Sequence, residues 1–358
     1  MSHPSKTPRS RLKPILGIAS IVAGLGLAFA WSADWIGHRG LTANQLLTSV
    51  EQDAPHPFPP GFRRAHGKGM CFTGQFVPTQ QASDLSSARI FSDSETSVLG
   101  RFSLGAGDPH AADNSTRILS MSLLFKQPDG GEWRMAMIND SFFPTATVEG
   151  LVAMGEAFAP DPITHQPVPA KIEAFYEAYP EARKYIEASD KAPWSRSFSG
   201  TPFYSINAFA FTNKQRQKRF VRWSWQPRLP FSGWPVESRD QASPQALFDD
   251  LVTSAASKPL VWDLIVTIAD PADPVNDPSQ PWPDSRLKVN AGTLTVNALS
   301  VQAKGACRDI NFDPTIVPSG VAISDDPILH ARSGVYAKSF NLREREVGQQ
   351  AARKEVTQ

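Results

Sequence analysis

DDPILHARSGVY, residues 325–336, is the stretch around which this chain is organised. One of its two leading aspartates can cap a helix, and Pro327 suits the first helical position. On such a helix Arg332 and Tyr336 are four residues apart, so their side chains share a face and can touch. A guanidinium stabilises the ionised form of a neighbouring phenol, and an ionised phenol is a metal ligand. The alternative is a packed tyrosine beside an arginine that reaches solvent.

A second candidate site lies in the glycine-rich segment 62–76. It contains His66 beside Gly67 and Gly69, and glycines allow the backbone to approach a flat ligand closely. Histidine is the side chain whose charge changes most readily near neutral pH, so it suits acid–base chemistry. Taken by itself, the segment favours an ordinary loop histidine over a chemical site.

Together the two segments resemble the catalase family. The Arg332-x-x-x-Tyr336 helix is similar to the proximal haem helix of that family, in which tyrosine ligates the iron. The run RRAHGKG, which starts at Arg63, resembles its distal motif. The resemblance implies a haem with Tyr336 as the metal ligand, Arg332 keeping that phenol ionised and His66 on the opposite side. It also implies that Arg63 pairs with a haem propionate.

The run Arg101-Phe102-Ser103 is similar to a strand of the same family. By that resemblance Arg101 faces a haem propionate and Ser103 hydrogen-bonds His66. Such a bond would fix the imidazole tautomer, which acid–base catalysis requires. The alternative is a structural strand with one surface arginine.

The distal asparagine of the family has an ambiguous counterpart here. The family strand reads Trp-x-x-x-x-Asn-Asn, and this chain reads WRMAMIND from Trp133. Without a gap the first asparagine position holds Ile138. Asn139 fills it only if the strand end shifts by one residue, which reverses the facing of a side chain. Asn139 is therefore the candidate catalytic asparagine, with Ile138 as the other possible occupant.

The bulk composition limits the class of protein. The chain has 358 residues, a formal net charge of +1 and 31 prolines. The balanced charge implies no nucleic-acid partner, and the prolines favour strands and turns over long helices. Strand patterns alternate with helical ones, which predicts an α+β fold built on an antiparallel barrel with inserted helices, as in the catalase core. The predicted strands include residues 118–126, 132–138, 203–211, 219–225, 260–270 and 286–301. The predicted helices include 41–53, 147–158, 169–189 and 244–256.

The amino terminus carries a membrane signal. Residues 1–13 contain four lysines and arginines and no acid, and residues 14–33 contain no charge. Such a run can span a bilayer, and the basic flank places the amino terminus in the cytoplasm. The alternatives are a removed signal peptide, cleaved near Ala28-Phe29-Ala30, and a buried soluble helix. We favour an inner-membrane anchor with the catalytic domain in the periplasm or outside the cell.

These patterns predict four parts: a basic flank and transmembrane segment (1–34), a linker (35–57), a catalase-like haem domain (58–342) and a charged, fraying tail (343–358). The resemblance ends soon after the proximal helix, so the chain is most similar to minimal, exported catalase-related peroxidases. That resemblance implies a haem peroxidase that uses a peroxide and an organic electron donor, with weak catalase activity at best. The alternatives are a haem-binding or haem-sensing protein without turnover, and a metal-free, membrane-anchored, β-rich carrier.

The two cysteines, Cys71 and Cys307, complete the predictions. An exported chain with two cysteines favours a disulfide, because its compartment is oxidising. The bond would clamp the distal segment to the segment that leads to the proximal helix. Two buried thiols are the alternative.

Overall fold

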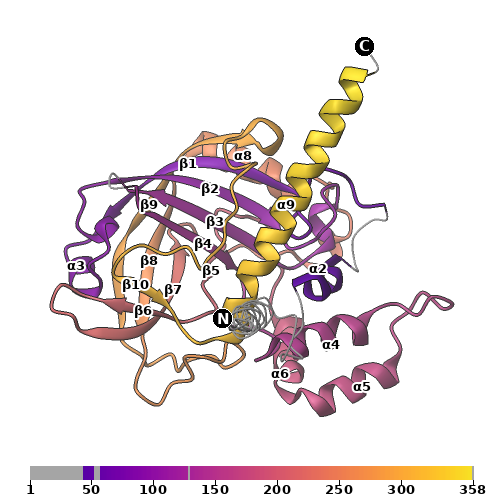
Figure 1. Cartoon of the computed structure of the whole chain (residues 1–358), viewed down its shortest axis with the longest axis horizontal. Helices are drawn as coiled ribbons and strands as arrows, with labels where there is room; N and C mark the ends of the chain where they lie inside the picture. The colour runs from indigo at the N-terminus through magenta and orange to yellow at the C-terminus, as the bar shows by residue number, and fades with distance from the viewer. Residues whose placement is uncertain (1–42, 52–56, 128–129, 357–358) are drawn as a thin grey trace, which may run out of the picture. The chain divides into compact units, whose positions relative to one another are not determined.

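Ten strands among the described residues form one antiparallel sheet that closes into a barrel (Figure 1). They are β1 Gly69–Pro78, β2 Thr96–Leu104, β3 Leu119–Lys126, β4 Glu132–Ile138, β5 Phe203–Tyr204, β6 Phe209–Thr212, β7 Lys218–Pro227, β8 Leu260–Ile268, β9 Lys288–Val301 and β10 Val321–Ile323. The order is β10-β6-β7-β5-β4-β3-β2-β1-β9-β8, and β7 also pairs with β8, so eight strands form a closed ring. The antiparallel barrel predicted from the sequence is confirmed.

The computed structural model describes residues 43–51, 57–127 and 130–356. The predicted membrane segment and its basic flank lie outside these ranges. Within them, no helix combines the length and the apolar character needed to cross a bilayer.

Aromatic side chains fill the barrel. Phe76 packs edge-on against Trp225 with ring centroids 5.8 Å apart, a geometry that aromatic pairs favour. Along β4 every second residue belongs to this core: Trp133, Met135 and Met137. This is the period of two that a strand imposes on its side chains. Met137, at the end of the row, also borders the cavity described below, so the core ends where the site begins.

Helices lie outside the barrel: α2 Ala43–Glu51, α3 Ala82–Leu85, α4 Val148–Phe158, α5 Pro169–Ala178, α6 Pro180–Lys191, α7 Val236–Arg239, α8 Ala246–Ser257 and α9 Pro327–Val356. In Figure 1 the yellow helix α9 passes along the barrel, and α2 lies beside it. Helix α2 also contacts α4, so three helices from distant parts of the chain meet over one side of the barrel.

Helix α9 begins as the sequence predicts but continues further. Asp326 Oδ1 accepts hydrogen bonds from the backbone N–H groups of Ile328 (2.9 Å) and Leu329 (3.3 Å), which caps the first turn. The helix then runs unbroken to Val356. The tail expected from residue 343 onward is therefore helical at least to Val356, and Arg343 is only 3 % exposed. The boundary placed between 342 and 343 falls inside this helix.

Two predicted elements are each divided in two. The helix expected over 169–189 is broken at Tyr179, because Pro180 has no N–H with which to continue the helix and starts α6 instead. The strand expected over 203–211 is interrupted between β5 and β6. There Ile206 has a φ of +51°, a left-handed conformation that a β-branched residue rarely adopts. A strained residue of this kind usually marks a functional segment.

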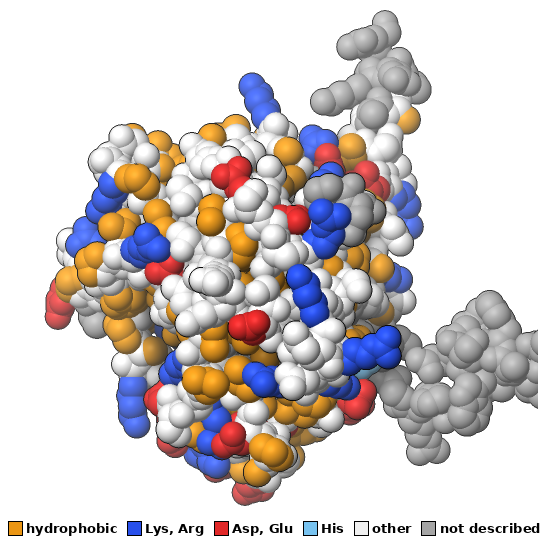
Figure 2. Space-filling view, turned by 90° about the vertical axis from the view of Figure 1, so that its left-hand side faces the viewer, with side chains coloured by type: hydrophobic (Ala, Val, Ile, Leu, Met, Phe, Trp, Pro, Cys, Tyr) orange, Lys and Arg blue, Asp and Glu red, His pale blue; other side chains and the backbone are white. Residues whose placement is uncertain are grey.

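Charged side chains of both signs are interspersed with apolar ones on the face shown in Figure 2. This matches the formal net charge of +1. Salt screens the interactions of such exposed charges beyond about 8 Å at physiological ionic strength. The face in this view therefore shows no extended surface of one sign.

Candidate active site

A cavity of about 330 Å³ lies between the barrel and helix α9. Its wall comes from the amino-terminal arm, the ends of β2, β3 and β4, the segment before β10, and helices α2, α4 and α9. Apolar side chains dominate it: Leu46, Leu47, Met137, Ile138, Phe143, Leu151, Ile206, Ile310, Phe312, Val335 and Phe340. The described residues that line the cavity include no Asp or Glu. They include four arginines: Arg63, Arg101, Arg332 and Arg343.

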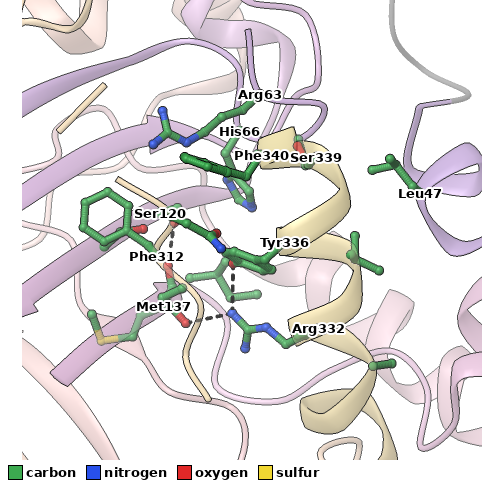
Figure 3. Close-up of a pocket in the computed structure, with 18 of the residues that line it drawn as sticks. Leu47, Arg63, His66, Ser120, Met137, Phe312, Arg332, Tyr336, Ser339 and Phe340 are labelled. Carbon is green, nitrogen blue, oxygen red and sulfur yellow. Dashed lines mark hydrogen bonds between the residues drawn. The ribbon is translucent and has the colours of Figure 1, made fainter. Parts of the chain in front are cut away.

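The predicted pair on α9 borders this cavity (Figure 3). Arg332 Nη2 donates a hydrogen bond to Tyr336 Oη at 3.2 Å and another to the carbonyl of Ala136 at 3.2 Å. Both side chains are half-buried. The guanidinium thus lies beside the phenol oxygen and is bonded to it directly.

The buried side-chain amide of Asn207 binds Arg332. Asn207 Oδ1 accepts a hydrogen bond from Arg332 Nη1 at 2.7 Å, and Asn207 Nδ2 donates to Asp326 Oδ2 at 2.7 Å. Asn207 and Asp326 have no exposed surface. The cap of α9 and the tyrosine-bound arginine therefore share one side chain. Burial, the largest influence, raises the pKa of the Asp326 carboxyl above its ordinary value.

The strained Ile206 explains how Asn207 reaches this position. Ile206 lines the cavity, and the next residue, Asn207, turns away from it toward the base of α9. Ser205 closes the turn on both sides, because its carbonyl accepts from Asn207 N at 2.6 Å and its Oγ donates to Asn207 O at 3.1 Å. The interruption of the predicted strand at Ile206 thus places the Asn207 amide within hydrogen-bond distance of Arg332.

His66 lies across the cavity on the arm before β1 (Figure 3). Its Nδ1 is 3.1 Å from the carbonyl of Leu104, and a carbonyl only accepts, so Nδ1 carries the proton and Nε2 has the free lone pair. Burial and then the charge of Arg101 lower the pKa of the ring to about 4. His66 is therefore neutral at ordinary pH. Its φ of +55° is a further strained backbone angle at the site.

The expected bond between Ser103 and His66 is absent. Ser103 Oγ is buried with no hydrogen-bond partner, and the Leu104 carbonyl fixes the imidazole in its place. A backbone acceptor one residue further along β2 thus does what the side chain was expected to do.

Arg101 is a buried cation with only neutral partners. Its Nε donates to Gln302 Oε1 at 2.6 Å, and its Nη2 donates to the carbonyls of His66 (2.6 Å) and Gly67 (3.2 Å). A Cβ on Gly69 would collide with the guanidinium, so the glycine opposite makes room for it. Burial lowers the pKa of Arg101 to about 9, which still leaves it charged at neutral pH.

Arg63 is held by a turn near the disulfide. Its Nη2 donates to the carbonyls of Cys307 (3.1 Å) and Ile310 (2.6 Å). Burial, followed by the charge of Arg101, lowers its pKa well below the ordinary value.

The structure contains the predicted disulfide between Cys71 and Cys307, with Cα atoms 5.4 Å apart. Arg63 and Arg101, the two arginines predicted for the distal side, both line the cavity.

Arg343 is a site residue that the sequence interpretation missed. It is buried, and its Nε and Nη2 make no hydrogen bond. The carboxylate of Glu344, which is half-exposed, lies 3.7 Å from Nε. Burial lowers its pKa as well. The spacing of Arg332, Tyr336 and Arg343 was the available signal, because positions i, i+4 and i+11 share a face of one helix.

Asn139 is the predicted site residue that lies elsewhere. Its Oδ1 accepts from Leu119 N at 2.9 Å and its Nδ2 donates to the carbonyl of Arg117 at 3.1 Å. It borders a second cavity, next to Asp140, whereas Ile138 borders the first. The strand end has not shifted, so the asparagine position predicted for Asn139 is occupied by Ile138.

The donor set fits a flat, largely apolar group that carries carboxylates. Arg63, Arg101 and Arg343 supply positive charge with few acidic partners, and a buried guanidinium is stabilised by a carboxylate it can bind with two bonds. Tyr336 offers one phenol oxygen to a metal, and His66 offers one free nitrogen to a reacting molecule. The apolar wall matches the remainder of such a group.

Comparison with known proteins agrees with this geometry. A family model described as Catalase matches residues 60–350. A catalase-related peroxidase of Synechococcus elongatus is 35% identical over 332 residues, which cover 92% of this chain and 96% of that protein. A catalase-related peroxidase of Mycolicibacterium paratuberculosis is 28% identical over 307 residues, with 85% and 95% covered.

Solved structures extend the likeness to the fold. Catalase A from Saccharomyces cerevisiae superposes with a TM-score of 0.70 at 18% identity, over 80% of this chain and 62% of that chain. A bacterial catalase gives 0.69 at 18% identity, over 80% and 58%. The chain therefore spans about three fifths of the length of these larger catalases.

Proposed function

The chain belongs to the catalase family, and we propose that it is a haem-dependent peroxidase. In this proposal it reduces organic hydroperoxides and hydrogen peroxide with an organic electron donor, and has weak catalase activity at best. One observation carries the proposal: Tyr336 with its bound arginine and a neutral His66 border one cavity. Two relatives named catalase-related peroxidase match over nearly their whole length, which supports the same reading.

The residues present fit a haem. Tyr336 would ligate the iron, and Arg332 stabilises the negative oxygen that this requires. Arg63, Arg101 and Arg343 would hold the propionates, because fixed guanidinium forks suit carboxylates. When bound, a haem with an anionic oxygen ligand supplies the electrons that cleave a peroxide O–O bond.

His66 moves the proton. Because Nδ1–H is bound to the Leu104 carbonyl, Nε2 faces a reacting molecule with its lone pair available. The ring takes a proton from the hydroperoxide as a general base and returns it to the departing oxygen as a general acid. A pKa of about 4 keeps the ring in the neutral, proton-accepting form across the whole physiological range.

The surroundings of His66 favour the peroxidase over the catalase reaction. Ile138 borders the cavity where the family resemblance implies an asparagine. An isoleucine cannot donate a hydrogen bond to a small peroxide, and one lost donor commonly costs a factor of about 100 or more in rate. A bulky hydroperoxide gains contacts with the apolar wall instead.

We also propose that the chain is membrane-anchored and exported, with residues 58–342 in the periplasm or outside the cell. The uncharged run 14–33 behind a basic flank supports this. The disulfide between Cys71 and Cys307 supports it too, because such bonds persist in oxidising compartments.

The test compares the purified wild-type protein with two histidine variants. An absorption spectrum should show a Soret band, cumene hydroperoxide should drive oxidation of an aromatic donor, and hydrogen peroxide should yield little oxygen. His66→Ala should abolish donor oxidation and keep the band, whereas the exposed His110→Ala should change neither. A sample without a Soret band contradicts the haem assignment. Unchanged turnover in His66→Ala contradicts the role of His66.

A further inference from the structure

The disulfide lies directly behind one arginine of the site. Cys71 comes from β1, and Cys307 follows the short 3-10 helix Gln302–Lys304 after β9. Both cysteines are buried, and they pack with Leu124 and Phe312. Phe312 also lines the cavity, so the bond connects a barrel strand to the cavity wall.

The residue that carries the sulfur also carries an acceptor for Arg63. Arg63 Nη2 donates to the carbonyl of Cys307 itself and to that of Ile310, and Ile310 N donates back to Cys307 O at 3.3 Å. Both acceptors thus belong to one short turn. The direction of the Arg63 guanidinium follows the position of that turn.

Few other bonds hold this turn in place. The backbone bonds of residues 305–310 stay within the segment and the preceding 3-10 helix, as in Gly305 N to Gln302 O and Arg308 N to Gly305 O. Arg308 pairs with its exposed neighbour Asp309. Towards the barrel, Arg134 Nη1 donates to the carbonyl of Asn311 at 2.6 Å. The disulfide is the covalent tie on the other side.

We propose that the Cys71–Cys307 disulfide is a positioning element for Arg63. By fixing the Cys307 and Ile310 carbonyls it holds the guanidinium toward the cavity, and thereby slows release of a carboxylate-bearing cofactor. This inference rests on the proposed function in one respect only, namely that haem is the ligand that Arg63 helps to retain.

The experiment compares four full-length proteins: wild type, Cys71→Ala/Cys307→Ala, Arg63→Ala and the triple variant. Because the cysteines are buried, replacement gives a cleaner comparison than chemical reduction. Each protein is loaded with haem, and transfer of haem to excess apomyoglobin is followed by absorbance. This double-mutant cycle separates the effect that passes through Arg63 from general loosening.

We expect loss of the disulfide to speed haem transfer about tenfold to a hundredfold, the range for one charge-assisted hydrogen bond. In the Arg63→Ala background the same loss should change the rate less than about twofold. Equal acceleration in both backgrounds overturns the route through Arg63. An unchanged rate in the cysteine variant overturns the proposal altogether.

A second measurement works without haem. Amide hydrogen exchange of residues 305–312 should be faster in the cysteine variant than in the wild type, while strands β3 and β4 should exchange alike in both. Unchanged exchange in 305–312 overturns the positioning role. One further outcome is that the wild type takes up no haem while residues 305–312 still exchange faster in the cysteine variant than in the wild type. In that case the proposed function fails and the link between the disulfide and the turn stands.

Discussion

Arg332 donates a hydrogen bond to Asn207 at 2.7 Å while it also binds Tyr336, so an amide from the barrel holds the guanidinium that serves the tyrosine. The same amide binds Asp326, the cap of α9. One side chain therefore contacts both the start of α9 and the arginine beside the phenol oxygen. Asn207 has no exposed surface, so water cannot replace either bond.

Replacing Asn207 by Leu should disturb both partners. The buried Asp326 carboxyl and the half-buried Arg332 guanidinium each lose a hydrogen bond. This costs about 1–3 kcal/mol for the buried group, and the freed arginine should shift the haem spectrum. Asn139→Leu is the matched control, because the Asn139 amide also makes two hydrogen bonds, in its case to backbone groups, but borders the second cavity. Denaturant unfolding and absorption spectra measure the two effects. A spectrum that changes equally in both variants would contradict this interpretation.

Tyr336→Phe should remove the metal ligand and preserve the packing. We expect loss of stoichiometric haem, or an altered spectrum if another group binds the iron. Tyr185→Phe is the control, because Tyr185 Oη donates to Asp140 Oδ2 at 2.5 Å in the second cavity. The measurement is haem content per chain, together with the absorption spectrum. An unchanged Soret band in Tyr336→Phe would show that Tyr336 is not the iron ligand.

Ile138→Asn should increase the catalase reaction. The variant places a hydrogen-bond donor where the cavity now has an apolar side chain, and a correctly oriented donor is worth about 100-fold or more in rate. Oxygen evolution from hydrogen peroxide should rise relative to donor oxidation. Asn139→Ala should leave the ratio unchanged, and a ratio that moves with Asn139 instead would restore that residue as the catalytic asparagine.

Arg343→Leu should have opposite effects on the two forms of the protein. Without haem, removal of a buried guanidinium with two unbonded nitrogens should raise the free energy of unfolding by about 1–3 kcal/mol. With haem, loss of a carboxylate partner should weaken binding about tenfold to a hundredfold. Thermal unfolding measures the effect on stability, and haem titration measures the effect on affinity. Arg345→Leu, at an exposed position, should change neither quantity. If haem-free Arg343→Leu is less stable than the wild type, the prediction is wrong.

His66 makes a specific contribution to stability against pH. Its pKa in the folded protein is about 4, below its ordinary value, because of burial and then the charges of Arg101, Arg332 and Arg63. The unfolded chain therefore binds a proton first as pH falls. The contribution is complete above pH about 6.5 and is lost progressively down to about pH 4. Haem-free wild type should lose more stability between these values than His66→Gln. Parallel losses would show that His66 does not titrate as described.

Much of the site could be predicted from local spacing. Arg332 and Tyr336 are brought together by the helix itself, and Arg63, His66 and Arg101 lie in short segments whose residues resemble a known pattern. All five border the same cavity. Nothing in this part of the prediction depended on how distant strands are paired.

The remainder depended on contacts that sequence spacing does not encode. Asn207 lay inside an alternating run that indicates a continuous strand, and the left-handed Ile206 that turns it toward α9 leaves no mark in that pattern. The Ser103 bond failed because the Leu104 carbonyl competes for the same imidazole nitrogen. Arg343 was missed because helix α9 was expected to end before it, although its spacing from Tyr336 indicated the same face.

Arg64 of the arm is paired with Glu346 of α9, and the two residues are 282 positions apart in the chain. The cavity is thus closed by the first and the last parts of the fold, with the barrel made in between. A ribosome must deliver nearly every residue before the two ends can meet, and contacts of such long range slow folding. Any molecule that binds in this cavity therefore has a complete site only after both ends of the fold have been made and have met.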